Sequence, residues 1–208
     1  MNILIVSATS FEIEAFSALK YNVDILITGV GAPACMYALT KKLQNNSYDF
    51  VIQAGIAGTF KKEFPLAETF IVTHDLFADL GIAEYENFYT LFDAKLADAN
   101  TLPYKNGWLQ NEGIINVGLA FAKSITVNTV SDNFTITEMY KKKFDADIES
   151  MEGAAFHHVC ISEDVPFLQL RCVSNFVGER LKSNWKIKES IENLNKNLKE
   201  VVDVLLRE

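Results

Sequence analysis

The chain has 208 residues, of which 49% are hydrophobic, which is enough to bury a substantial core in one domain covering residues 1–208. Its formal net charge of −8 argues against nucleic acid as a partner, because no basic surface is available to displace counterions from phosphates. The chain contains no stretch of about 18 consecutive apolar residues, so we expect no membrane-spanning segment. The N-terminus lacks the basic region and cleavage site of a signal peptide, so we expect a cytoplasmic protein.

Apolar runs rich in β-branched residues predict strands at intervals along the chain. These runs are Ile3–Val6, Val23–Ile27, Phe50–Gln53, Glu68–Thr73, Ile114–Val117, Ser124–Asn128 and Phe167–Val173. Helices are predicted at Ala34–Leu43, Gly153–Ser162 and at the C-terminus, where apolar residues from Ile187 to Leu205 recur at spacings of 3 and 4. This alternation predicts an α/β fold with three α/β/α layers and a central mixed, mostly parallel sheet.

The segment Gly29-Val30-Gly31-Ala32-Pro33-Ala34 follows a predicted strand and fits one form of the dinucleotide-binding fingerprint. Such a site also needs an acidic residue at the end of the next strand, whereas Asp49 precedes that strand. We therefore interpret the glycines as a tight, closely packed turn. The three cysteines have no metal-ligand spacing and are expected to be small buried hydrophobic residues; they are Cys35, Cys160 and Cys172.

In α/β sheets, ligands bind beyond the carboxyl ends of the strands. Polar groups occur at four such places, either just after a predicted strand or just before a predicted helix. They are Glu12, the run Gly55–Gly58, the pair Glu149 and Glu152, and Asn175. Each also has a purely structural interpretation. Glu12 completes a capping box with Thr9, Glu152 is a first-turn acid, and the other groups fit ordinary turns.

Taken together, these segments resemble the nucleoside phosphorylase superfamily, on the branch that includes methylthioadenosine/S-adenosylhomocysteine nucleosidase. The matching motifs occur in order over residues 1–180. They are SATSFEIEAF, GIAG, Ser131-Asp132-Asn133-Phe134, Met151-Glu152-Gly153-Ala154-Ala155 and Arg171-Cys172-Val173-Ser174-Asn175. Within the superfamily, SNFVGER followed by Trp185, and FADLG at Phe77–Gly81, resemble the futalosine hydrolase family, from which Leu181 departs in the loop after Arg180.

The resemblance implies a site residue by residue. Glu12 would be the general base for the attacking water, and Glu152 would hold the ribose hydroxyls. Phe134 would stack on the purine, although a buried phenylalanine also fits a core position. The implied catalytic residues are Glu12, Glu152 and Asn175. The implied substrate-binding residues are Ile56, Ala57, Gly58, Phe134, Thr135, Met151 and Arg180.

Asn175 indicates which purine the site accepts. Nucleosidases for 6-aminopurines carry Asp at this place, whereas an Asn amide can donate to the O6 of a 6-oxopurine. The resemblance thus favours hypoxanthine or guanine over adenine. The source of the proton that N7 gains remains open at this point.

The turn that carries Glu12 has no arginine or lysine before Lys20, and a carboxylate there would repel phosphate and suits water. The resemblance therefore implies hydrolysis of futalosine to hypoxanthine and dehypoxanthine futalosine, in menaquinone biosynthesis. We expect no metal, no cofactor, no contact with membranes, and a homodimer or higher homo-oligomer. The alternatives are a methylthioadenosine/S-adenosylhomocysteine-type nucleosidase, a purine nucleoside phosphorylase, and a nucleotide-binding protein without catalysis.

Overall fold

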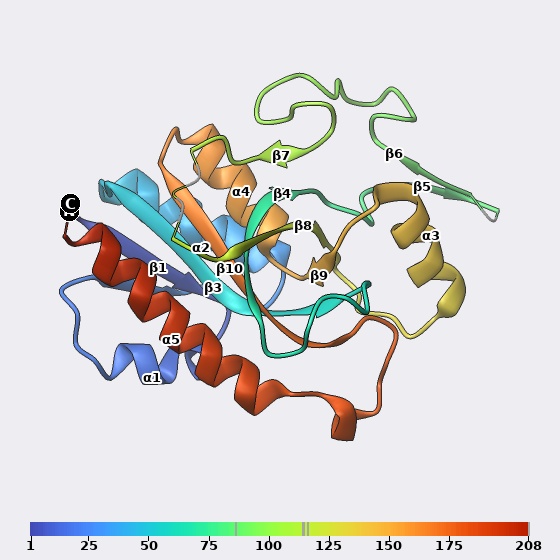
Figure 1. The fold of residues 1–208 in the computed structure, drawn as a ribbon. Helices are drawn as coiled ribbons and strands as arrows, with labels where there is room; N and C mark the ends of the chain where they lie inside the picture. Colours follow the sequence, from blue (N-terminus) through green and yellow to red (C-terminus); the bar gives the residue numbers. More distant parts are fainter. Residues whose placement is uncertain (86, 114, 116, 208) are drawn as a thin grey trace.

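An eight-stranded mixed sheet is the centre of the fold (Figure 1). The computed structural model describes residues 1–85, 87–113, 115 and 117–207. The sheet order is β10-β4-β8-β9-β3-β1-β2, with β7 paired to β4, and β5 and β6 form a separate two-stranded sheet. The bounds are β1 (Ile3–Ser7), β2 (Asp24–Ile27), β3 (Phe50–Thr59), β4 (Thr69–Asp75), β5 (Gly81–Glu84), β6 (Asn87–Thr90), β7 (Leu109–Gln110), β8 (Ala120–Thr126), β9 (Ile148–Ser150) and β10 (Phe167–Phe176).

The large sheet closes on itself, because β10 pairs with both β4 and β3. Strand β3 pairs in parallel with β1 along its first half and antiparallel with β9 at Gly58 and Thr59. Two features bend the long strands: β3 contains Gly55 and Gly58, and the register of β10 shifts between Val173 and Asn175. The predicted α/β class and mixed sheet are confirmed, but this closure was not predicted.

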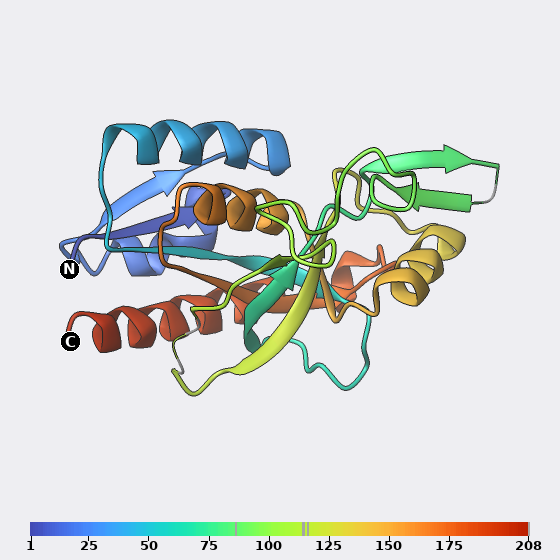
Figure 2. The same cartoon turned by 90° about the horizontal axis from the view of Figure 1, so that it is seen from above.

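Helices pack on both faces of the sheet, as the two views in Figures 1 and 2 show. The helices are α1 (Glu14–Ser17), α2 (Ala32–Asn45), α3 (Phe134–Phe144), α4 (Gly153–Ser162) and α5 (Ile187–Leu205). Alternation along β1 sets the two sides. Ile3 and Ile5 pack in the cluster that includes α5, whereas Leu4 and Val6 pack in the cluster that includes α2 and α4.

Most elements predicted from the sequence are present, and α4 has the predicted bounds. The three cysteines are buried, as predicted. The strand predicted at Ile114–Val117 includes residues 114 and 116, which lie outside the described residues. No strand or helix was predicted for β5, β6, β7, β9 or α3. Among the described residues, no helix combines the length and apolar character needed to span a membrane.

The glycine turn before α2 is a tight turn that contacts the site. Gly29 and Gly31 have φ angles of +86° and +98°, which favour glycine, and Pro33 lies in the first turn of α2. The backbone N–H of Gly31 donates to Oε1 of Glu152 at 2.9 Å. The turn therefore helps to position a carboxylate of the site.

Candidate active site

A cavity of about 370 Å³ lies where β1, β3, β9 and β10 end. Eight of the ten predicted site residues line it: Glu12, Ile56, Ala57, Gly58, Met151, Glu152, Asn175 and Arg180. The other two, Phe134 and Thr135, lie in the first turn of α3 outside its lining, and Phe134 is 76% exposed. Their contact with a purine therefore stays a prediction.

Glu12 is held in a fixed position by donors from three directions. It lies in the 3₁₀ helix Ser10–Ile13 that follows β1. Its Oε2 accepts hydrogen bonds from the N–H and hydroxyl of Thr9 at 3.1 and 3.0 Å and from the Ser7 hydroxyl at 3.3 Å. Its Oε1 accepts from the backbone N–H of Ile56 at 3.1 Å. The capping box is present, and the same carboxylate lines the cavity, so the two interpretations of Glu12 are compatible.

Glu152 immediately precedes α4, but its side chain makes no capping hydrogen bond. Its Oε2 lies 3.5 Å from Nη2 of Arg171, and the same nitrogen donates to Oε1 of Gln53 at 3.0 Å. Arg171 is 1% exposed. A buried cation of this kind requires an anionic partner, so Glu152 and Arg171 stabilise each other at the base of the cavity.

Gly55 leaves the space in which these charged groups meet. A Cβ added at Gly55 would lie 2.3 Å from Nη1 of Arg171 and 3.1 Å from Oε1 of Glu12. No real side chain tolerates the first distance, so any other residue would displace the arginine. The first glycine of the GIAG run therefore has a packing function that the sequence did not reveal, and Arg171 belongs to the site although it was not predicted there.

Asn175 lies near the end of β10, and its side-chain amide has a defined orientation. The hydroxyl of Ser174 donates to its Oδ1 at 2.8 Å, and its Nδ2 donates to the carbonyl of Phe176 at 3.0 Å. Ser174 itself is 2% exposed and is also within 3.2 Å of the carbonyl of Ala57. The second N–H of the Asn175 amide remains for a ligand acceptor.

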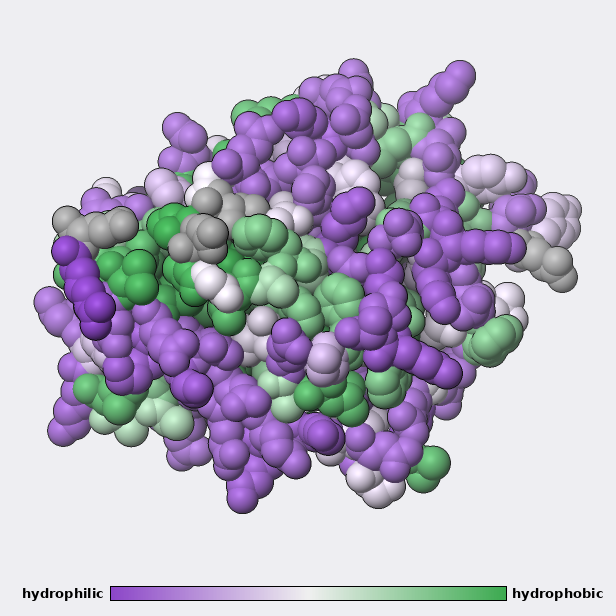
Figure 3. Space-filling view, in the orientation of Figure 1, coloured by the Kyte–Doolittle hydropathy of each residue, from purple (hydrophilic) through white to green (hydrophobic). Residues whose placement is uncertain are grey.

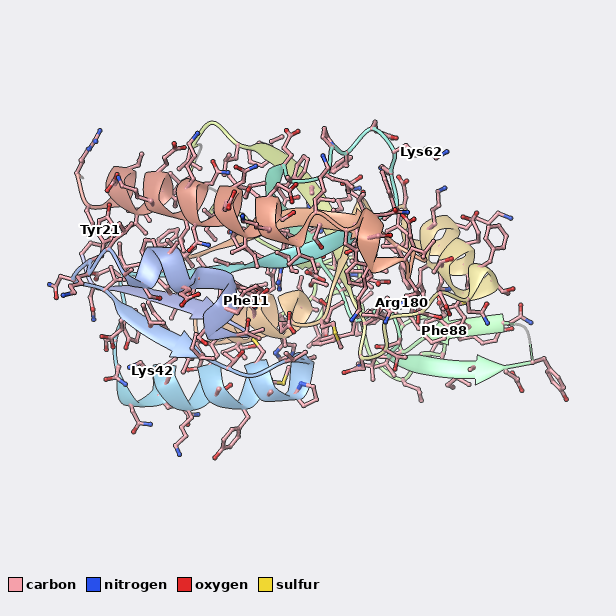
Figure 4. The ribbon with its side chains drawn as sticks, turned by 90° about the horizontal axis from the view of Figure 1, so that it is seen from below. Phe11, Tyr21, Lys42, Lys62, Phe88 and Arg180 are labelled. Carbon is pink, nitrogen blue, oxygen red and sulfur yellow. The ribbon has the colours of Figure 1, made fainter. Side chains whose placement is uncertain are left out.

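Arg180 and Trp185 border the cavity in the loop after β10. The guanidinium carbon of Arg180 lies 5.6 Å from the centre of the Trp185 ring, and the Trp185 indole donates to the carbonyl of Glu179 at 2.9 Å. Phe11 and Arg180, both labelled in Figure 4, line the cavity from different parts of the chain. The stacked arginine provides a cation next to the site.

Two further carboxyl groups line the cavity that were not predicted as site residues, Glu149 and Glu179. Glu149 on β9 is buried, and burial together with the nearby charge of Asp79 raises its pKa to about 7. In the sequence it was one of the polar groups noted beside the predicted strands, but no role in the site was assigned to it. Its place in the wall depends on the pairing of the three-residue strand β9 with β3, which has no sequence signal of its own.

A second cavity, of about 240 Å³, lies near β6 and α3. Its walls are largely aromatic and aliphatic, and its two charged side chains, Asp93 and Lys143, pair with each other at 2.7 Å. It contains none of the predicted site residues.

The face of the molecule in Figure 3 is largely hydrophilic, with apolar surface gathered beside α5.

Comparison with protein families identifies the class of protein that this fold and site define. The model of the phosphorylase superfamily matches residues 3–207. The chain therefore belongs to the phosphorylase superfamily.

Two characterised relatives indicate where in the superfamily the chain lies. It is 30% identical to the futalosine hydrolase of Thermus thermophilus over 172 residues, which are 81% of this chain and 76% of the relative. It is 26% identical to the 5'-methylthioadenosine/S-adenosylhomocysteine nucleosidase of Haemophilus ducreyi, over 76% of this chain and 68% of the relative.

Solved structures confirm the fold. The native futalosine hydrolase of Helicobacter pylori superimposes with a TM-score of 0.80 at 17% identity, covering 98% of this chain and 97% of that one. A mutant of the Helicobacter pylori methylthioadenosine nucleosidase with 5'-methylthioadenosine in its active site gives a TM-score of 0.82 at 18% identity, over 97% and 98% of the two chains. At these identities the likeness concerns the fold alone.

Proposed function

We propose that this protein is a futalosine hydrolase, which cleaves the N-glycosidic bond of futalosine with water to give hypoxanthine and dehypoxanthine futalosine. One observation carries the proposal: the Glu12 carboxylate is fixed in the cavity wall by its hydrogen bonds to Thr9, Ser7 and Ile56, in the same cavity as Glu152 and Asn175. The 30% identity with the Thermus thermophilus enzyme supports this choice of substrate.

The proposed reaction assigns one step to each group. A water oxygen forms a bond to the anomeric carbon of the ribose while Glu12 takes one proton from that water. The C1′–N9 bond breaks, its electron pair leaves with the purine, and N7 of the purine gains a proton from a second water molecule. The proton held by Glu12 neutralises the hydroxide that this leaves, which regenerates the carboxylate. Negative charge on Glu12 and Glu152 stabilises the positive charge that develops on the sugar.

The residues around these carboxylates favour water over phosphate as the nucleophile. Phosphate needs several exposed cationic donors, but the Arg171 guanidinium is buried and already bonded to Gln53 and paired with Glu152. Arg180 lies in the outer loop, stacked on Trp185, where it can pair with the carboxylate of the futalosine tail. We assign to Phe134 and Thr135 the outer side of the purine site, at the start of α3.

The proposal extends to the pathway and the assembly. The reaction would serve menaquinone biosynthesis, and the enzyme would work as a homodimer or larger homo-oligomer. Exposed apolar side chains beside the cavity support an assembly that covers this region; they include Phe11, Val30 and Phe134, which are 61%, 59% and 76% exposed.

The test is incubation of the protein with futalosine, aminodeoxyfutalosine, inosine and methylthioadenosine, each with and without phosphate, followed by chromatography of the released base. We expect hypoxanthine from futalosine at a rate that does not depend on phosphate. If adenine is released preferentially from methylthioadenosine, the protein is instead a methylthioadenosine nucleosidase. A strict phosphate requirement with a sugar 1-phosphate product would establish a phosphorylase.

A further inference from the structure

Glu149 is a buried carboxyl group of the cavity wall that has no partner in the described part of the chain. It is 6% exposed, and no hydrogen bond or ion pair joins it to a described residue. The other three carboxylates of the cavity differ in this respect, because Glu12 accepts hydrogen bonds from Thr9 and Ile56, Glu152 accepts one from Gly31, and Glu179 accepts one from Asn184. Because the carboxyl group lines the cavity, a ligand N–H can reach it and supply a hydrogen bond.

The strand register places Glu149 and Asn175 on either side of Gly58 in the sheet. Gly58 on β3 pairs with Glu149 on one side and with Asn175 on the other. Residues that face each other on neighbouring strands direct their side chains to the same face of a sheet. Glu149 and Asn175 therefore flank Gly58 at a separation of two strand spacings, about 10 Å.

Gly58 leaves the space between these two side chains open. A Cβ at Gly58 would lie 3.3 Å from Nδ2 of Asn175 and 3.0 Å from Val177. Because the glycine has no side chain, a flat base can lie above it with its O6 and N7 edge toward Asn175 and the adjoining N1–H edge toward Glu149. All three residues line the same cavity.

We propose that Glu149 is the second residue that selects the base, and that its carboxylate accepts a hydrogen bond from N1–H of a 6-oxopurine whose O6 and N7 edge faces Asn175. This inference rests on the proposed function. In a 6-oxopurine nucleoside, N1–H is the ring N–H donor of the base. In a 6-aminopurine, N1 is an acceptor, so an ionised carboxylate would face it unfavourably.

The surroundings of Glu149 are compatible with a hydrogen bond from N1–H of the base. Burial first, and then the charge of Asp79, raise its pKa to about 7. The charges of Asp79 and Glu149 also act on Tyr140 of α3, while Glu12, Glu152 and Glu179 are the other carboxylates of the cavity. The ionised form therefore costs little at neutral pH, and a ligand N–H donor favours it further.

The test compares wild type with Glu149→Met, which removes the acceptor at similar volume, and Glu149→Gln, whose amide oxygen can still accept. Glu163→Gln, at an exposed carboxylate after α4, is the matched control. Equilibrium affinities for hypoxanthine and adenine are measured by calorimetry, and kcat/KM is measured for futalosine and aminodeoxyfutalosine.

We expect Glu149→Met to weaken hypoxanthine binding by about 10- to 100-fold and to leave adenine unchanged or tighter. Glu149→Gln should lie between wild type and Glu149→Met for hypoxanthine. Equal losses for both bases, or an unchanged preference, would overturn the role of Glu149 while leaving the proposed function intact if wild type still hydrolyses futalosine. A wild-type protein that neither binds hypoxanthine nor cleaves futalosine would overturn both.

Discussion

The Ser174 hydroxyl donates to Oδ1 of Asn175 at 2.8 Å, so the side-chain oxygen of Asn175 is held on the serine side and its nitrogen faces the Phe176 carbonyl. This pair fixes the amide in one of its two orientations. The restriction by Ser174 agrees with the interpretation of Asn175 as a residue that distinguishes an acceptor at purine position 6 from a donor.

Replacement of Asn175 by Asp should therefore change base selectivity. In Asn175→Asp, a carboxylate oxygen would take the place of the nitrogen that now bonds to the Phe176 carbonyl, so an ionised side chain would face two acceptors, that carbonyl and O6 of hypoxanthine. The mismatch should cost about 1–3 kcal/mol in transition-state binding of futalosine. The measurement is the ratio of kcat/KM for futalosine and aminodeoxyfutalosine. A ratio equal to that of wild type would show that Asn175 does not select the base.

Substitution of Glu12 by Gln should leave the fold intact and remove most of the turnover. The amide oxygen can keep the hydrogen bonds from Thr9 that Oε2 now accepts, whereas the amide nitrogen replaces Oε1 and loses the bond from the Ile56 N–H. The side chain can no longer take a proton from water. We expect a loss in kcat of about 10²- to 10⁴-fold, with an unchanged circular dichroism spectrum. Glu14→Gln, at an exposed position two residues away, is the control and should keep wild-type turnover. Near-normal kcat in Glu12→Gln would limit Glu12 to its capping function.

Arg180 should contribute to binding of the futalosine tail and not to binding of the base. In Arg180→Ala the cation that stacks on Trp185 is lost, so KM for futalosine should rise roughly tenfold, equivalent to about 1.4 kcal/mol, while inosine should change little. Lys182→Ala removes an exposed cation two residues further along and serves as the control. Similar increases in KM for both nucleosides would argue against recognition of the tail.

Glu149 should also make the stability of the protein depend on pH. Its pKa is raised from 4.5 to about 7, so between these values the folded state holds a proton that the unfolded state has lost. Stability therefore falls as pH rises from about 4.5 to 7, by an amount on the order of 3 kcal/mol, and then stays level with respect to this group. Urea unfolding of wild type and Glu149→Gln at pH 5 and pH 8 measures the effect. The variant should lose less stability than wild type, and parallel losses would show that Glu149 is not buried as a neutral acid.

The sequence predicted those parts of the site that follow long apolar strands. Glu12 and Asn175 follow such strands, and α/β topology brings the ends of those strands together, so their proximity could be expected before the structure was known. The MEGAA motif similarly predicted Glu152 at the start of α4.

The remaining parts depend on long-range pairing. The function of Glu149 depends on the antiparallel contact of the short strand β9 with β3, and the space at Gly55 depends on a buried arginine that is 116 residues further along the chain, at position 171. No local pattern encodes either relationship. The closure of the sheet was missed for the same reason, because it follows from β10 pairing with two different strands.

The proposed hydrolysis is tested most directly by the origin of the oxygen atom that the sugar gains. Wild-type protein should be incubated with futalosine in water enriched in oxygen-18, in phosphate buffer, and the sugar product analysed by mass spectrometry after a single turnover. We expect one heavy oxygen in dehypoxanthine futalosine and no phosphate ester, because a water molecule next to Glu12 is the nucleophile. An unlabelled product, or a sugar 1-phosphate, would contradict it.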